Sequence, residues 1–280
     1  MKNLQTISEV RQCVDIWRRG GERIAFVATM GNLHEGHLTL VREAKRCADK
    51  VIVSIFVNPT QFGVNEDFSN YPRTETQDCL KLADEDCDAV FLPSVETLYS
   101  SEAKTSIHIA GISDYFCGAS RSGHFSGVAT VVCKLFNIVT PDCALFGLKD
   151  FQQFLVIQTL VRDLNLPVDI VGVPTVREID GLAMSSRNGY LTPQERDVAP
   201  QIYKILQIAR NQIINTSTSF TQIQEQSIAI LTEYGFVVDY FSVARRDDLM
   251  LASRNDKNLI ILVAAKLGKT RLIDNLWIDK

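Results

Sequence analysis

The first half of the chain alternates short apolar runs rich in Val, Ile and Phe with longer segments of helical periodicity. This alternation constrains the fold more than any other feature, because turn residues bound each apolar run as they do buried strands. The helical segments include Val128–Val139, with apolar residues at the i, i+3, i+4, i+7 spacing, and Phe151–Leu164. The pattern predicts an α/β fold with a parallel sheet. The predicted strands are Ile24–Thr29, Val51–Val57, Ala89–Leu92, Cys143–Phe146 and Val168–Val173.

The alternation of strand-like and helix-like segments ends near Val173-Pro174. Three later strands, Phe236–Val243, Leu259–Ala265 and Arg271–Ile278, are spaced too closely for crossover helices. Two long polar-faced helices precede them, and Thr192-Pro193-Gln194-Glu195 begins the first with an N-cap threonine, a first-turn proline and a capping-box glutamate. We therefore expect a second, smaller α+β domain.

Composition argues against two classes of function. The 280 residues carry a net charge of −4, so we expect no basic surface of the kind that binds nucleic acid. The longest apolar runs are of strand length, far short of the roughly 20 residues that cross a bilayer, and Met1–Arg19 has no secretory-signal pattern. The 7 cysteines lack a CxxC pair, which indicates reduced thiols. We expect a cytoplasmic protein without nucleic-acid or membrane partners.

The segment after the first predicted strand places two histidines three residues apart. His34 and His37 flank Gly36, where a helix over Leu38–Cys47 is expected to open. A helix N-terminus offers free backbone N–H groups and the positive end of its dipole, which suit a phosphate chain. Parallel sheets also bind ligands beyond the carboxyl ends of their strands. The segment is therefore a candidate triphosphate site.

Two other interpretations apply to these histidines. Each imidazole could simply cap the helix or pack locally. A zinc site is a weaker interpretation, because HEGH lacks the four-residue helical offset of HExxH and no third ligand is evident.

The segment resembles the HxGH signature of the nucleotidyltransferase superfamily, which includes class I aminoacyl-tRNA synthetases and cytidylyltransferases. By itself it implies only chemistry at a nucleotide α-phosphate. Five further blocks, in order along nearly the whole chain, resemble those of the pantothenate synthetase family. They are Ser54–Phe62 (SIFVNPTQF), Tyr71–Thr74 (YPRT), His124–Val128 (HFSGV), Phe146–Gln153 (FGLKDFQQ) and Gly181–Asn188 (GLAMSSRN).

The resemblance implies an ATP-using ligase. Its reaction condenses (R)-pantoate with β-alanine to give pantothenate, AMP and pyrophosphate through a pantoyl adenylate, within coenzyme A biosynthesis. It also implies a Rossmann-like domain over residues 1–175 that binds ATP and pantoate, and a smaller α+β lid domain over residues 176–280. A homodimer and dependence on Mg²⁺ are implied as well.

The residues of these blocks suit adenylation, which needs no protein nucleophile but requires substrates held in line and charge neutralised. We expect catalytic roles for His34, His37, Lys149, Ser186 and Arg187, since cationic and N–H donor groups bind phosphate oxygens. The loop that carries Arg187 is expected to close over ATP and exclude water from the adenylate. The residues expected to contact ATP are Met30, Gly31, Asn32, Leu33, His34, Glu35, Gly36, His37, Gly147, Leu148, Lys149, Asp150, Val176, Met184, Ser185, Ser186 and Arg187.

Gln61 and Gln153 are the candidates for pantoate recognition. Each follows the carboxyl end of a predicted strand, and each amide carries a donor and an acceptor, which suits a hydroxyl beside a carboxylate. Met30 and Phe62 are expected to cover the methyl groups of pantoate. Asp150 suits either the nucleotide ribose or a helix cap.

The sequence departs from the family pattern at two places. Ala28 stands where the family often has proline, and Gln77-Asp78 stands where some members have two adjacent acids. Asp78 is therefore only a weak candidate for a magnesium ligand, and the protein ligands of magnesium are left unknown. We expect ATP oxygens and water to hold most of the Mg²⁺ coordination.

Several other features carry no expected chemistry. Leu267-Gly268-Lys269-Thr270 resembles the end of a P-loop, but the earlier glycine is missing, so a hairpin turn is predicted. His108 and Arg245-Arg246 are assigned to a strand and the solvated surface. Two alternatives to ligation stay open: another nucleotidyl transferase, with a nucleotide-linked product, and a nucleotide-binding protein without catalysis.

Overall fold

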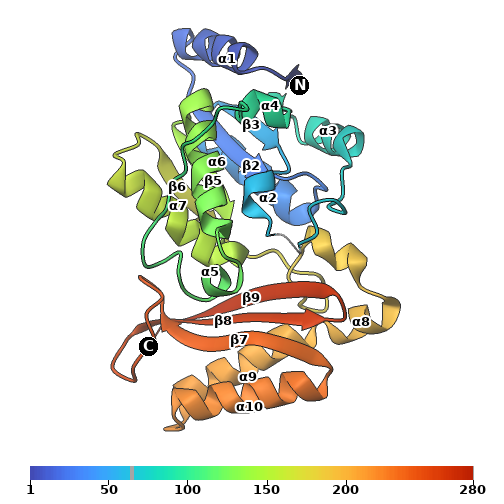
Figure 1. Ribbon diagram of the computed structural model, residues 1–280, viewed down its shortest axis with the longest axis vertical. Helices are drawn as coiled ribbons and strands as arrows, with labels where there is room; N and C mark the ends of the chain where they lie inside the picture. Colours follow the sequence, from blue (N-terminus) through green and yellow to red (C-terminus); the bar gives the residue numbers. More distant parts are fainter. Residues whose placement is uncertain (64–65, 280) are drawn as a thin grey trace. The chain divides into compact units, whose positions relative to one another are not determined.

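The computed structural model describes residues 1–63 and 66–279 (Figure 1). Contacts divide the chain into two compact units. The first comprises Met1–Leu148 and Gln153–Pro174, and the second comprises Lys149–Gln152 and Thr175–Lys280.

The first unit contains a six-stranded sheet in which every neighbouring pair is parallel, in the order β1-β4-β3-β2-β5-β6. This confirms the predicted α/β fold. All five predicted strands form, with ends that shift by up to two residues, and β1 is an additional short strand. The strands are β1 (Lys2–Leu4), β2 (Ile24–Thr29), β3 (Lys50–Ile55), β4 (Ala89–Phe91), β5 (Cys143–Gly147) and β6 (Asp169–Val173).

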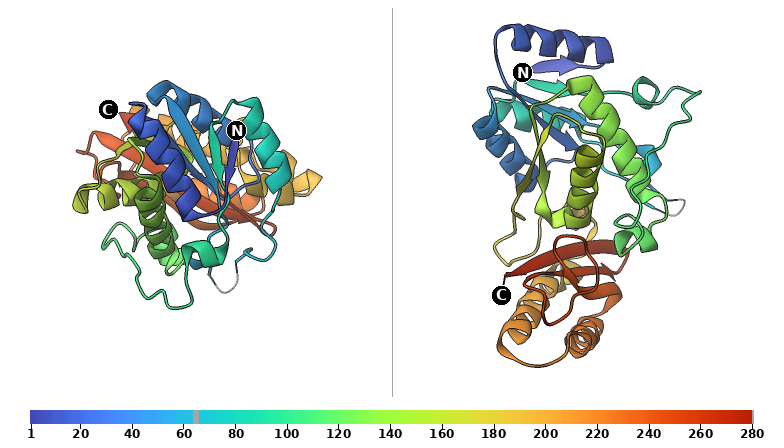
Figure 2. Two further views of the ribbon diagram at one scale, coloured as in Figure 1. Left: turned by 90° about the horizontal axis from the view of Figure 1, so that it is seen from above. Right: turned by 90° about the vertical axis from the view of Figure 1, so that its left-hand side faces the viewer.

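Helices cover both faces of this sheet (Figures 1 and 2). Alternate residues of β2 point to opposite faces, as strand geometry requires. Ala25 and Val27 pack in one buried cluster with Leu40 of α2, whereas the ring of Phe26 meets Phe136 of α6 edge-on at 6.3 Å. The helical segments are α1 (Ile7–Arg19), α2 (Glu35–Cys47), η1 (Pro59–Gln61), α3 (Glu75–Asp84), α4 (Val95–Leu98), α5 (Cys117–Ser120), α6 (His124–Val139), η2 (Leu148–Asp150) and α7 (Phe151–Asp163).

The second unit pairs three antiparallel strands with helices, as the close strand spacing predicts. The strands are β7 (Phe236–Arg245), β8 (Asn258–Leu267) and β9 (Thr270–Asp279), and the helices are η3 (Ser186–Tyr190), α8 (Pro193–Val198), α9 (Gln201–Asn215) and α10 (Phe220–Glu233). The predicted capping box forms at Thr192 and Glu195, but it begins the short helix α8 and not the first of the two long helices, which are α9 and α10. Gly268-Lys269 is the two-residue turn between β8 and β9, so the predicted hairpin is confirmed.

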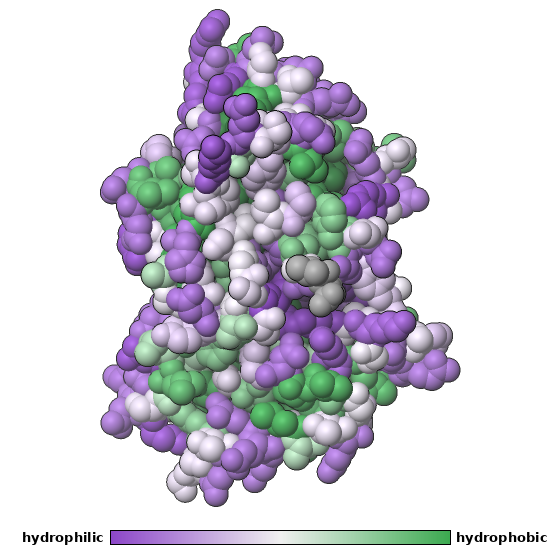
Figure 3. Space-filling model, viewed as in Figure 1, coloured by the Kyte–Doolittle hydropathy of each residue, from purple (hydrophilic) through white to green (hydrophobic). Residues whose placement is uncertain are grey.

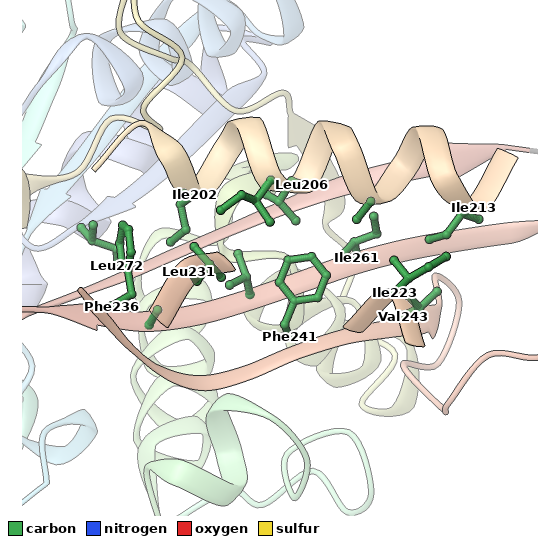
Figure 4. Packing of buried hydrophobic residues seen from close by; sticks show 14 of the residues in the cluster. Ile202, Leu206, Ile213, Ile223, Leu231, Phe236, Phe241, Val243, Ile261 and Leu272 are labelled. Atoms are coloured by element: carbon green, nitrogen blue, oxygen red, sulfur yellow. The ribbon is translucent and has the colours of Figure 1, made fainter. Parts of the chain in front are cut away.

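The core of the second unit lies between its sheet and the helices α9 and α10 (Figure 4). Ile202 and Leu206 of α9, Ile223 of α10, and Phe241 and Ile261 of the sheet are each at most 2% exposed. Along α9, buried Ile202, Ile205 and Leu206 have the i, i+3, i+4 spacing of an apolar face.

Figure 3 shows hydrophilic residues over much of the visible surface, with patches of hydrophobic residues among them. No helix among residues 1–63 and 66–279 is long and apolar enough to cross a membrane.

Candidate active site

The carboxyl ends of three neighbouring strands lead into three of the predicted motifs. β2 lies between β3 and β5 in the sheet. The chain leaves β2 through α2 to reach β3, whereas β5 pairs with the other side of β2. Such a reversal of strand order opens a crevice for ligands at the strand ends. The segment that begins at Met30 follows β2, the segment that leads to Gln61 follows β3, and Leu148 follows β5.

His34 is the N-cap residue of α2, which begins at Glu35 and not at Leu38 as predicted. The backbone N–H of Gly36 donates to Nδ1 of His34 at 3.1 Å. The backbone N–H of His34 in turn donates to Nδ1 of His37 at 3.3 Å. The local capping considered for these histidines is therefore present, and a side chain at each end of the first turn satisfies two N–H groups.

The same bonds orient the two rings. The ring centroids of His34 and His37 lie 4.0 Å apart with a tilt of 34°. Since both Nδ1 atoms accept hydrogen bonds, the proton of each neutral ring sits on Nε2. Each Nε2–H is thereby a donor, and both belong to the positive end of a helix dipole. Capping and phosphate binding are compatible because they use different nitrogens.

Gln61 is held from several sides at the end of η1. The side chain is 9% exposed. Its Oε1 accepts from Nδ2 of Asn58 at 3.2 Å, and its Nε2 donates to the sulfur of Met30 at 3.2 Å. The structure thus brings together two of the residues predicted to contact pantoate.

A buried histidine and an ion pair support Gln61 from the side of α6. The backbone carbonyl of Gln61 accepts from Nδ1 of His124 at 2.8 Å. Arg121 lies 2.9 Å from Nε2 of His124 and donates to both carboxylate oxygens of Glu66, at 2.6 Å each. Burial alone raises the pKa of the Glu66 carboxyl, but the hydrogen bonds and charge of Arg121 outweigh burial, and the pKa is lowered from its ordinary value.

The supporting roles of Asn58, Arg121 and His124 were not predicted from the sequence. Asn58 and His124 lie inside two of the family-like blocks, so a signal was present. It did not indicate which partners they would have, because His124 reaches Gln61 across 63 positions of sequence.

Phe62 belongs to an aromatic cluster. Its ring meets Phe68 at 5.3 Å and Tyr71 at 5.8 Å, both nearly edge-on. The ring is partly buried. Gln153 is also partly buried, in the first turn of α7.

Asp78 of α3 is fully buried, and its carboxylate accepts the backbone N–H groups of Asn32 and Leu33 at 2.8 Å each. Within residues 1–63 and 66–279, no three His, Cys, Asp or Glu side chains gather as a metal site.

The second unit carries the remaining predicted residues. The backbone carbonyl of Lys149 accepts from Nδ2 of Asn275 on β9 at 3.0 Å. Asp150 is exposed directly before α7. The N–H of Met184 donates to the carbonyl of Val176 at 3.0 Å, and Oγ of Ser185 caps η3 by accepting from the N–H of Arg187 at 3.2 Å.

A buried ion pair holds the segment before the MSSR loop. Arg177 donates to both carboxylate oxygens of Asp274, at 2.6 and 2.9 Å, and to the carbonyl of Gly181 at 3.1 Å. Its guanidinium lies 3.6 Å from the ring centroid of Tyr203. Gly181 has φ of +95°, and a Cβ there would lie 2.8 Å from that ring. The loop therefore begins at a fixed turn that only glycine fits.

Strand β2 of the parallel sheet leads into the HEGH sequence at the N-terminus of α2. The chain belongs to the Pantoate-beta-alanine ligase family, whose profile matches residues 2–277.

Individual relatives match this chain over nearly their whole length. The chain is 54% identical to the pantothenate synthetase of Acinetobacter baumannii (strain ATCC 17978), with 99% of this chain and 98% of that protein covered. It is 53% identical to the pantothenate synthetase of Alteromonas mediterranea, with both chains fully covered.

Solved structures show the same fold. The pantothenate synthetase of Thermus thermophilus superposes with a TM-score of 0.91 at 41% identity and covers 99% of each chain. The pantoate-beta-alanine ligase of Francisella tularensis, solved with beta-gamma ATP and beta-alanine, has a TM-score of 0.83 at 35% identity and covers 99% of this chain and 97% of its own.

Proposed function

We propose that His34 and His37 are the triphosphate-binding centre of this ligase, and that their two Nε2–H donors act on the adenylation step. The enzyme catalyses the ATP-dependent condensation of pantoate with β-alanine. The observation that carries the proposal is the pair of Nδ1 acceptor bonds, which leaves the proton of each neutral ring on Nε2 at a helix N-terminus.

The first half-reaction joins pantoate to AMP. A carboxylate oxygen of pantoate attacks the α-phosphorus of ATP, the bond to the bridging oxygen breaks, and pyrophosphate leaves. Negative charge grows on the leaving pyrophosphate, so fixed N–H donors and cations lower the barrier. We assign the donors to His34 and His37 and the cations to Lys149 and Arg187.

The second half-reaction forms the amide. The amine of β-alanine attacks the acyl carbon of pantoyl adenylate, AMP leaves with the bonding electron pair, and the amine loses a proton. Water competes with the amine at this carbon, so exclusion of water raises the yield of pantothenate. We assign this exclusion to residues 176–280 as a lid, with Met184, Ser185, Ser186 and Arg187 on the loop that covers ATP. Residues 1–175 then bind ATP and pantoate.

Pantoate recognition is assigned to Gln61 and Gln153, with Met30 and Phe62 against its methyl groups. Two observations support the assignment of Gln61. Its amide is already fixed by Asn58 and Met30, and a fixed amide loses little entropy when it binds a hydroxyl or carboxylate.

Magnesium is proposed to arrive with ATP. The described residues offer no cluster of carboxylates for it, and Mg²⁺ in nucleotide sites is often held mostly by phosphate oxygens and water. A homodimer and a cytoplasmic location are also proposed, on the family resemblance alone; sedimentation of the purified protein tests the first, and fractionation of the source cells tests the second.

The test is a reaction that contains ATP, Mg²⁺ and pantoate but no β-alanine, followed by mass spectrometry. We expect a pantoyl-adenylate peak and pantoate-dependent exchange of labelled pyrophosphate into ATP, with AMP release only after β-alanine is added. His37→Ala and Lys149→Ala should reduce the exchange, whereas the exposed His108→Ala should not. Exchange that is indifferent to pantoate, or unchanged in His37→Ala, would reject the proposal.

A further inference from the structure

The loop between β2 and α2 has an uncommon backbone conformation. Gly31 has φ of +81° and Asn32 has φ of +49°, so two successive residues lie in the left-handed region. Asparagine tolerates this region better than most residues but still prefers others. Contacts from neighbouring residues hold this conformation, and the loop leads directly into the N-cap His34.

The carboxylate of Asp78 is the main support. Oδ2 accepts the N–H of Asn32 and Oδ1 accepts the N–H of Leu33, both at 2.8 Å. Thr74 donates its hydroxyl to Oδ2 at 3.0 Å. Both oxygens thus accept from the loop, Oδ2 also accepts from the N-cap residue of α3, and Asp78 is 0% exposed.

Lys81 also supports the loop, through the carbonyl group of Leu33. Its Nζ donates to the carbonyl of Leu33 at 2.6 Å. Asp78 and Lys81 are three residues apart on α3, so they share one helix face. The N–H and the carbonyl of Leu33 are therefore both bonded to α3, one residue before the first histidine of the HEGH sequence.

The fit between Gly31 and Asp78 is close. A Cβ at position 31 would lie 3.1 Å from Oδ2 of Asp78 and 3.0 Å from the side chain of Ile55. The loop thus packs directly on the carboxylate, and a displacement of Asp78 must move the loop.

We propose that Asp78, with Lys81, is a positioning residue for adenylation that acts through the HEGH histidines and does not bind magnesium. The hydrogen bonds of Asp78 and Lys81 to the loop, here called the α3 clamp, fix residues 31–33. His34 and His37 then present their Nε2–H donors to the triphosphate. A magnesium ligand needs an oxygen that faces the nucleotide, whereas both oxygens of Asp78 accept hydrogen bonds from backbone N–H groups of the loop. The inference rests on the proposed role of the two histidines.

The test uses Asp78→Asn, Lys81→Met, His37→Ala and the double variant Asp78→Asn/His37→Ala, with the exposed Asp84→Asn of the same helix as the control. Asparagine keeps the shape of Asp78 but leaves at least one loop N–H without an acceptor. Pyrophosphate exchange is measured against ATP, pantoate and Mg²⁺ concentrations, and thermal unfolding reports folding. Lys81→Met probes the same clamp should Asp78→Asn not fold.

We expect Asp78→Asn to lower the maximal exchange rate by up to about 100-fold, since a displacement of about 1 Å can cost that much. The KM for pantoate and the Mg²⁺ concentration for half-maximal rate should stay near wild-type values. Lys81→Met should show the same signature with a smaller loss, and Asp84→Asn should show none. The double variant should be no slower than His37→Ala, because a residue that acts through the histidine adds nothing once the ring is gone.

Three results would overturn the inference while the proposed function stands: wild-type exchange in both Asp78→Asn and Lys81→Met, recovery of Asp78→Asn at high Mg²⁺, or losses that multiply in the double variant. Unchanged exchange in His37→Ala is a different outcome. It would overturn the role of the histidines and this inference together.

Discussion

Nδ1 of His124 donates a hydrogen bond to the backbone carbonyl of Gln61 at 2.8 Å. The carbonyl can only accept, so Nδ1 carries the proton. Arg121 can only donate, so Nε2 of His124, 2.9 Å from its guanidinium, is the acceptor. The two partners fix one neutral tautomer of a buried ring, and that ring fixes the backbone of the proposed pantoate-binding glutamine.

We predict that His124→Ala raises the KM for pantoate by roughly fivefold to tenfold, because loss of a buried hydrogen bond costs about 1 kcal/mol or slightly more. The KM for ATP should change little. Steady-state kinetics with each substrate varied in turn measure the difference, and His108→Ala, whose side chain is 57% exposed, is the control. An equal rise in both KM values would indicate a general loss of structure instead.

The Glu66–Arg121 ion pair should make stability depend on pH. The pKa of Glu66 in the folded protein is lowered, so the unfolded chain takes up its proton first as pH falls. The stabilisation is therefore complete above the ordinary glutamate pKa of about 4.3 and is lost as pH falls through the lower folded pKa.

Urea unfolding of the wild type and Glu66→Gln should differ by about 1 kcal/mol at pH 7, and the difference should shrink below about pH 4.3. Asp84→Asn provides the comparison with an exposed carboxylate and should show little difference at either pH. If the difference in unfolding free energy grew as pH fell, it would contradict the lowered pKa of Glu66.

The fold was largely predictable because its signals are local. Each of the five predicted strands is a short apolar run between turn residues, and such a run is visible without knowledge of its partners. β1 was missed because Lys2–Leu4 has only three residues, two of them polar. Its pairing with β4 comes from the tertiary structure and not from strand propensity.

The residues of the proposed site also fall into two groups, those that local sequence predicts and those that it does not. His34 and His37 were identified because the HEGH sequence is contiguous and stands at a strand end. The role of Asp78 was not predictable, since its bonds to residues 32 and 33 span more than 40 positions of sequence. A carboxylate beside a nucleotide motif suggests a metal ligand until its neighbours are known, and here those neighbours are backbone N–H groups.

The cysteines should differ sharply in reactivity. Burial is the largest cause that raises the pKa of Cys87 to about 12 and that of Cys143 to about 11. At pH 8 a thiol of pKa 12 is about one ten-thousandth thiolate, compared with about a quarter for an ordinary thiol of pKa 8.5. Pulsed alkylation at pH 8 with peptide mass spectrometry should find the partly exposed Cys47 modified well before the buried Cys87 and Cys143. In urea all of these should react alike, and early modification of native Cys87 would contradict the prediction.

The ion pair between Arg177 and Asp274 should contribute far more to stability than a surface pair on the same strand. The side chain of Asp274 is 0% exposed and that of Arg177 is 17% exposed, so Asp274→Asn leaves a largely buried guanidinium without its counter-charge, at a cost of about 3 kcal/mol. The matched control is Asp279→Asn, which removes an ion pair with Arg246 at a side chain that is 71% exposed and should cost at most about 1 kcal/mol. Chemical unfolding of both variants measures the contrast. Arg177→Met/Asp274→Leu should recover much of the lost stability, because it removes both charges together. If Asp274→Asn and Asp279→Asn lowered the unfolding free energy equally, burial would not determine how much the ion pair contributes.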